Sequence, residues 1–191
     1  FAGHMGGLVT AVTELADGRL VMLMDVEKIL ADTTHADDDY LYAAVQPLDV
    51  AEPRTILFCD DSAIARKQIE KTLNAMGIHY HAANNGRQAW ETLLRIAEQA
   101  DAAHQPVSHF VQLVLTDVEM PEMDGYMLTK QIKADPRFAG IPVIMHSSLS
   151  GMSNQQLGRS VGVDEYVSKF EPQRLAETLA RMLKGNVRAA A

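Results

Sequence analysis

The sequence lacks the residues that several classes of protein depend on. Its 191 residues include one cysteine, Cys59, so no disulfide framework can form, which fits a reducing compartment. No apolar run approaches the roughly 20 residues that a membrane-spanning helix needs, and no secretory signal is visible. We therefore expect a cytoplasmic protein that does not insert into a membrane.

The sequence also has no excess of basic residues. The formal net charge is −8, and residues 1–52 account for all of it with ten acids and two bases. Residues 53–191 carry fifteen of each sign. Neither part has the basic face of a nucleic-acid-binding protein, so we expect no nucleic-acid partner. The change in charge between Glu52 and Pro53 predicts a domain boundary there.

What the sequence does contain is a stretch, Leu113–Gly125, that begins as a short apolar run and ends at an acid, Asp117. Pro121 and Gly125 then break the chain before the next helix-like segment. A short apolar run between polar residues is typical of a buried parallel strand. An acid at the carboxyl end of such a strand lies where open α/β sheets bind their ligands.

A second apolar run, Thr55–Cys59, ends in Asp60 and Asp61. If both runs are parallel strands, three carboxylates meet at one edge of the sheet, and such close like charges cannot all stay ionised and unpaired. A hard divalent cation with oxygen ligands resolves the repulsion, and Mg²⁺ is the expected ion. Two further runs end near Ser147 and at Lys169, which adds a hydroxyl and an ammonium group to the same edge.

Strand-like and helix-like segments alternate along the chain from residue 53 to 187. This alternation predicts a parallel sheet with helices on both faces. The expected strands are 55–59, 78–82, the run from 113 that carries Asp117, 142–146 and 165–168, and the expected helices are about 63–76, 87–103, 126–134, 153–160 and 172 onward. Since the chain soon ends after Gly185, we expect no output domain, and we assign 188–191 to a tail.

Four separated motifs, in this order, resemble the response-regulator receiver domain. They are D-D-S at 60–62, D-x-x-M-P-x-M-D-G at 117–125, the serine that follows P-V-I-M-H, and Y-V-S-K at 166–169. The resemblance covers about residues 53–187. It implies a flavodoxin-like, doubly wound sheet of five parallel strands.

The resemblance also implies a phosphoryl-acceptor site. Asp117 would accept a phosphoryl group from a histidine kinase. Asp60, Asp61, Asp117 and the backbone carbonyl of Glu119 would bind Mg²⁺. The Glu119 carboxylate could bind the metal through water or order the water that attacks the acyl phosphate, and the sequence does not decide between these. Such a domain is no enzyme for an external substrate, although it catalyses its own phosphorylation and dephosphorylation.

The remaining site residues would contact the phosphoryl group or respond to it. Lys169 and Ser147 would contact the phosphoryl oxygens. Ser147 would then move inward and Tyr166 would change rotamer, which makes these two residues the switch. The family usually has a proline directly after the lysine, often with a cis peptide, and Phe170 stands there in this chain.

The amino-terminal region predicts a small separate element. Residues 1–7 contain G-H-M and look like a cloning remnant. Two β-prone runs, 8–15 and 19–24, flank Ala16-Asp17-Gly18, which predicts a β-hairpin, and a short helix is expected at 26–30. Residues 8–31 resemble the carboxyl end of a CheW-like coupling domain. A hairpin with so many apolar residues should pair with a second copy, making a dimer, or dock on a receiver.

Residues 32–52 are expected to form an acidic linker. Four apolar residues in it have helical spacing and would allow a short amphipathic turn that packs on a neighbour, namely Leu41, Tyr42, Val45 and Leu48.

Three functions compete at this point. The first is a CheV-type chemotaxis protein, a CheW-like domain followed by a receiver, with a chemotaxis histidine kinase and chemoreceptors as partners. Its receiver would tune receptor–kinase coupling or act as a phosphate sink. The second is a stand-alone single-domain response regulator. The third, a metal-dependent phosphatase of the haloacid dehalogenase type, is disfavoured because Asp60 and Asp61 are adjacent instead of forming D-x-D.

Overall fold

The computed structural model describes residues 9–24, 29, 39–148 and 158–185. The chain divides into two compact units, Phe1–Tyr40 and Leu41–Ala191. Most of the helix expected at 26–30 and most of the helix expected at 153–160 lie outside the described residues. In the described part of the chain, no helix combines the length and the apolar character that crossing a bilayer requires.

The first unit contains the predicted hairpin. Strand β1 (Val9–Glu14) pairs antiparallel with β2 (Leu20–Met24). Gly18 in the turn has a φ of 82°, a conformation that glycine adopts without cost. The hairpin exposes several large apolar side chains, namely Val12, Leu15, Leu20, Met22, Leu23 and Met24.

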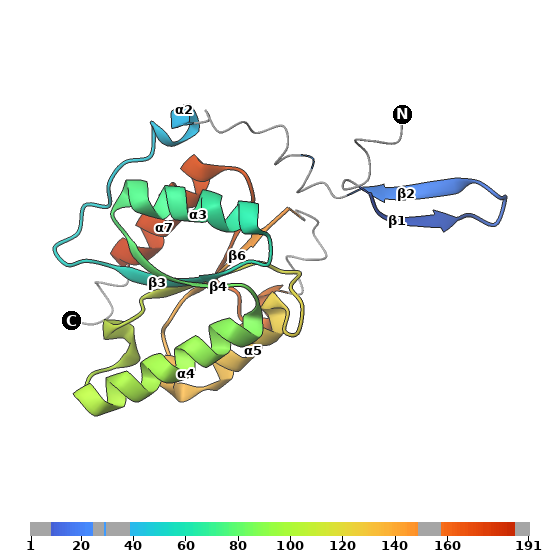
Figure 1. Ribbon diagram of the computed structural model, residues 1–191. Coiled ribbons are helices and arrows are strands. Elements are labelled where there is room, and N and C mark those ends of the chain that lie inside the picture. The colour runs from blue at the N-terminus through green and yellow to red at the C-terminus, as the bar shows by residue number, and fades with distance from the viewer. Residues whose placement is uncertain (1–8, 25–28, 30–38, 149–157, 186–191) are drawn as a thin grey trace. The chain divides into compact units, whose positions relative to one another are not determined.

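The second unit is built on a five-stranded parallel sheet (Figure 1). Its strands are β3 (Thr55–Cys59), β4 (His79–Ala83), β5 (Leu113–Thr116), β6 (Val143–Ser147) and β7 (Glu165–Ser168). They lie in the order β4-β3-β5-β6-β7, the doubly wound order of flavodoxin-like folds. The predicted fold class is therefore confirmed, and the predicted strand and helix bounds agree with the structure to within about one residue.

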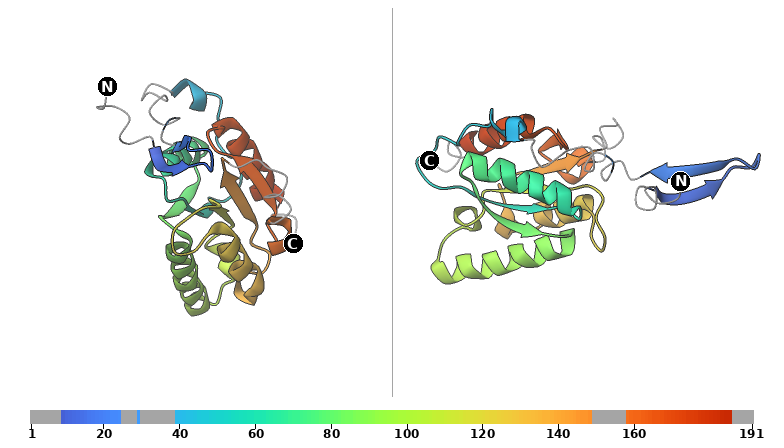
Figure 2. Two further views of the ribbon diagram at one scale, coloured as in Figure 1. Left: turned by 90° about the vertical axis from the view of Figure 1, so that its right-hand side faces the viewer. Right: turned by 45° about the horizontal axis from the view of Figure 1, so that its top comes forward.

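Helices cover both faces of this sheet (Figures 1 and 2). Helices α3 (Ala63–Met76) and α7 (Pro172–Gly185) pack on one face, and α4 (Gly86–Ala103) and α5 (Gly125–Ala134) pack on the other. Two short 3₁₀ turns, η1 (Val107–His109) and η2 (Pro136–Phe138), join helices to strands. The central strands β3 and β5 consist mainly of buried apolar residues, as expected for strands covered on both faces.

Side-chain caps start three of the helices immediately beyond the carboxyl edge of the sheet. The oxygens of Ser62, Asn85 and Asp124 accept hydrogen bonds from backbone N–H groups in the first turns of α3, α4 and α5, respectively. Each helix therefore begins close to the edge where the acids lie.

Part of the segment expected as a linker packs on the second unit. Helix α2 (Asp39–Tyr42) is one short turn, and residues 43–54, which lead from it to β3, have no helical structure. Val45 is 7% exposed and belongs to the core under α3 and α7, and the Leu48 N–H donates to the Met76 carbonyl at 2.8 Å. The predicted packing is present, but the helical spacing is wrong beyond Tyr42.

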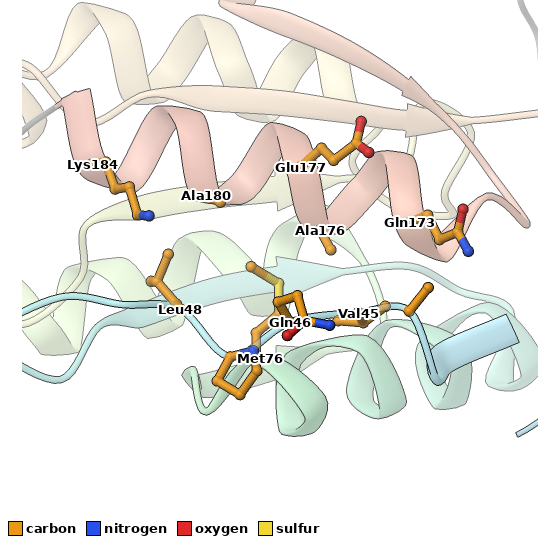
Figure 3. Close-up of a pocket in the computed structure, with 11 residues that line it drawn as sticks. Val45, Gln46, Leu48, Met76, Gln173, Ala176, Glu177, Ala180 and Lys184 are labelled. Carbon is orange, nitrogen blue, oxygen red and sulfur yellow. The ribbon is translucent and has the colours of Figure 1, made fainter. Parts of the chain in front are cut away.

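Figure 3 shows this segment beside α7. A cavity of about 320 Å³ lies between residues 44–48, Met76 and the α7 side chains Gln173, Ala176, Glu177, Ala180 and Lys184.

Candidate functional site

The ends of β3 and β5 bring three carboxylates together. One oxygen from each of Asp60, Asp61 and Asp117 lies within 4.8 Å of the others. Asp60 and Asp117 are buried, whereas Asp61 is exposed. The predicted meeting of these acids at one edge follows from the register, which places Cys59 opposite Thr116, one residue before each acid.

Lys169 reaches this cluster from the end of β7. Its Nζ lies 2.9 Å from Asp117 Oδ2 and 3.1 Å from Asp60 Oδ2, and its side chain is 1% exposed. A buried ammonium requires such partners, because desolvation of an unpaired charge costs several kcal/mol.

One lysine does not neutralise three acids. Burial raises the pKa of Asp60 from 3.8 to about 7, Lys169 opposes that rise, and the charge of Asp117 adds to it. The ionised form of Asp60 is therefore disfavoured in the protein alone. A further cation at the cluster would favour it.

The loop after Asp117 is held by backbone contacts. The Val118 N–H donates to Asp117 Oδ1 at 2.6 Å, and the Gly125 N–H donates to the Val118 carbonyl at 2.9 Å. A side chain at Gly125 would collide with the Asp117 carbonyl. The glycine of the D-G pair is thus needed for the close return of the chain.

An open pocket of about 650 Å³ adjoins the acids. Its lining comes from the residue after Asp60, the loop after β5 and the first turn of α5, and consists of Asp61, Val118, Glu119, Met120, Pro121, Asp124 and Tyr126. Glu119 therefore lies on the same pocket as Asp61.

The switch candidates lie on the neighbouring strands. Ser147 is the last residue of β6, is 5% exposed, and its carbonyl accepts the Lys169 N–H at 3.1 Å. Tyr166 in β7 lies opposite Met145. The described peptide bonds are all trans, and Phe170 has a φ of 66°, so Phe170 departs from the usual proline geometry.

Two residues at the site escaped the sequence analysis. Arg66 Nη1 donates to the carbonyls of Asp60 and Asp61 at 2.8 and 2.9 Å. His146 is 3% exposed, and burial, aided by the charge of Lys169, lowers its pKa from 6.5 to about 3. Two features of the sequence could have indicated these residues. Arg66 lies one helical turn after the Ser62 cap, and His146 is a polar residue inside an apolar strand.

The residues present fit a magnesium ion. Carboxylate oxygens are the ligands that Mg²⁺ prefers, and three carboxyl groups face a single ammonium group within the cluster. Asp61, exposed at the pocket, can reach an ion that enters from solvent.

Comparison with known proteins agrees with this architecture. Residues 56–180 match the family model described as the response regulator receiver domain. The chain belongs to this family. The chain is 30% identical over 173 residues to chemotaxis protein CheV1 of Helicobacter pylori, a match that covers 90% of this chain and 51% of that protein. The chain thus spans about half the length of that relative.

Two shorter relatives match the receiver alone. Chemotaxis protein CheY1 of Helicobacter pylori is 35% identical over 133 residues, covering 69% of this chain and 98% of that protein. The crystal structure of chemotaxis protein CheY4 of Vibrio cholerae superimposes with a TM-score of 0.56 at 26% identity, covering 69% of this chain and 99% of that one.

Proposed function

We propose that this receiver acts in chemotaxis signalling by accepting a phosphoryl group on Asp117 from a chemotaxis histidine kinase. The observation that carries the proposal is the buried contact of Lys169 with Asp117 and Asp60 beside the exposed Asp61. The names of the relatives supply the pathway: CheV1 and CheY1 are both chemotaxis proteins.

In this proposal the carboxylate of Asp117 is the nucleophile. A new P–O bond to Asp117 forms while the P–N bond of the donor phosphohistidine breaks, and the imidazole leaves. Phosphoryl transfer needs positioning and charge neutralisation more than covalent assistance. Lys169 supplies positive charge next to the phosphoryl oxygens, on which negative charge develops. The Ser147 hydroxyl donates a hydrogen bond to one of these oxygens.

The metal would be bound by Asp60, Asp61, Asp117 and the Glu119 carbonyl. Bound Mg²⁺ would neutralise charge on the transferring group. Arg66 holds the backbone of Asp60 and Asp61 through both of their carbonyls, and the Ser62 N–H orients the Asp60 carboxylate by donating to its Oδ1 at 2.9 Å. The same residues would support loss of the phosphoryl group to water, with Glu119 placed at the pocket to order that water.

The biological output would be an altered coupling between chemoreceptors and kinase, or removal of phosphoryl groups from the kinase. Movement of Ser147 and Tyr166 would transmit phosphorylation to the surface around β7. The match to half of CheV1 and the amino-terminal hairpin favour this output over that of a stand-alone regulator. The nearly full-length match to CheY1 keeps the stand-alone regulator as the second candidate.

Mass spectrometry tests the chemistry. After incubation with Mg²⁺ and a small phosphodonor, the protein should gain one phosphoryl group, and Asp117→Asn should gain none. Asp101→Asn, on the exposed side of α4, is the matched control and should label normally. Full labelling of Asp117→Asn would refute the assignment.

Experiments on the amino-terminal hairpin can distinguish CheV-type coupling from a stand-alone regulator. Its exposed apolar side chains would be covered by the remainder of a larger β domain in a longer protein, or by the hairpin of a second copy. Sedimentation with and without residues 1–31 tests the second arrangement, which predicts a dimer that the deletion dissociates. If the chain without residues 1–31 still co-sediments with receptor–kinase complexes, that result would favour the stand-alone regulator.

A further inference from the structure

A third small core lies beyond the carboxylate cluster. Val118, Met145 and Val163 are buried in it, and Tyr126, Val161 and Tyr166 pack around them. Tyr126 is in the first turn of α5, and it also lines the open pocket beside Asp61 and Glu119. One side chain therefore belongs both to the mouth of the phosphoryl-acceptor site and to the core that holds Tyr166.

Two partners fix the Tyr166 hydroxyl. It is hydrogen-bonded to the side chain of Tyr126, and it accepts a hydrogen bond from the backbone N–H of Gly158. Burial, together with Tyr126, holds the pKa of Tyr166 well above its usual value, so the hydroxyl keeps its proton. Gly158 is buried, and a side chain there would collide with the Tyr166 hydroxyl.

We propose that Tyr126 is a positioning residue that holds Tyr166 against Gly158 through their hydroxyl–hydroxyl hydrogen bond, and so sets how readily Tyr166 moves when the site at Asp117 is filled. This inference rests on the proposed function for its link to phosphorylation. The resting position of Tyr166 follows from the contacts alone.

The consequence is energetic. A state in which Tyr166 has moved loses the bond to Tyr126, so the bond stabilises the resting state and reduces affinity for any ligand that requires the moved state. A neutral hydrogen bond contributes enough to alter such an affinity by roughly two- to tenfold. Removing the Tyr126 hydroxyl should therefore tighten binding of a phosphoryl analogue by that factor.

Tyrosine ¹³Cζ NMR with a beryllofluoride titration in Mg²⁺ tests this on the full chain. Tyr126→Phe keeps the ring in the core and removes only the hydroxyl, and Gly158→Ala displaces Tyr166 by a different route. Both variants should shift the Tyr166 resonance before any ligand is added and should lower the beryllofluoride midpoint. Tyr80→Phe, on β4 beside Phe58, is the control and should change neither.

The outcomes separate the two proposals. An unchanged Tyr166 resonance in Tyr126→Phe would overturn the positioning role. A shifted resonance with an unchanged midpoint would overturn the coupling to the Asp117 site. If the wild-type protein does not bind beryllofluoride, the proposed function is overturned. Comparison of the Tyr166 resonance in the wild type and in Tyr126→Phe without ligand would still decide whether Tyr126 holds Tyr166.

Discussion

The ammonium nitrogen of Lys169 lies 2.9 Å from Oδ2 of Asp117, although 52 residues separate them in the sequence. Both side chains are buried, so each charge depends on the other. Asp60 shares the same ammonium at 3.1 Å. Removal of the lysine would leave two buried acids with no positive partner inside the cluster.

Lys169→Met should therefore destabilise the protein by about 3–5 kcal/mol at pH 8, because it leaves buried charges uncompensated. The loss should be smaller at pH 5, where the acids can take up protons. Urea unfolding at the two pH values measures this, with Lys130→Met on the exposed side of α5 as the control. An equal loss at both pH values would contradict the assignment.

Magnesium should stabilise the protein, and more so above neutral pH. The pKa of Asp60 is raised from 3.8 to about 7, so without metal its contribution to folding falls as pH rises from 3.8 to 7. An ion that binds the ionised site reverses this trend. At about 100 times its dissociation constant the gain is about 2.7 kcal/mol.

Thermal unfolding with and without Mg²⁺, at pH 6 and pH 8, measures this gain. The shift should be larger at pH 8, and Asp61→Ala should abolish most of it. Shifts of the same size at both pH values would count against Asp60 as part of the metal site.

His146 should make the fold sensitive to acid. Its pKa falls from 6.5 to about 3 on folding, so the unfolded chain binds more protons between these values. The contribution of His146 is therefore complete above pH 6.5 and declines by about 1.4 kcal/mol for each pH unit below it. This trend opposes that of Asp60.

The variant His146→Val replaces the imidazole with an apolar, strand-forming side chain and removes the titration. Its unfolding free energy should fall less steeply than that of the wild type between pH 6.5 and pH 4. Parallel curves would show that His146 is not the titrating group.

The packing of Val45 and Leu48 predicts where the receiver can be cut. A chain of residues 41–191 should be more stable than one of residues 53–191 by about 2–4 kcal/mol, since one fully buried apolar side chain contributes about 1.5–3 kcal/mol. Denaturant unfolding of the two chains compares them. In the full chain, Val45→Asn should reproduce part of the loss, and Ala43→Asn, at an exposed position, should not.

The sequence predicts the sheet well because its strands are local signals. Each strand is a short apolar run that ends in a polar residue, and the alternation of strands with helices leaves few possible topologies. The same signal indicates that Asp60, Asp61, Asp117 and Lys169 meet, because the carboxyl ends of parallel strands share one edge.

What the sequence does not predict depends on contacts between distant segments. The spacing of Val45 and Leu48 looks helical, yet Pro47 lies between them and their positions are set by Met76 and α7. The role of Tyr126 depends on a partner 40 residues later in the chain, which no local pattern reveals.

Residues 44–48 line one side of the groove at the end of α3 and α7. Any protein that recognises this pair of helices must displace that segment from the groove or bind on top of it. Residues 44–48 would therefore compete with such a protein for one face of the receiver. Changes at Val45 or Leu48 would act on this face of the receiver without touching the acidic site.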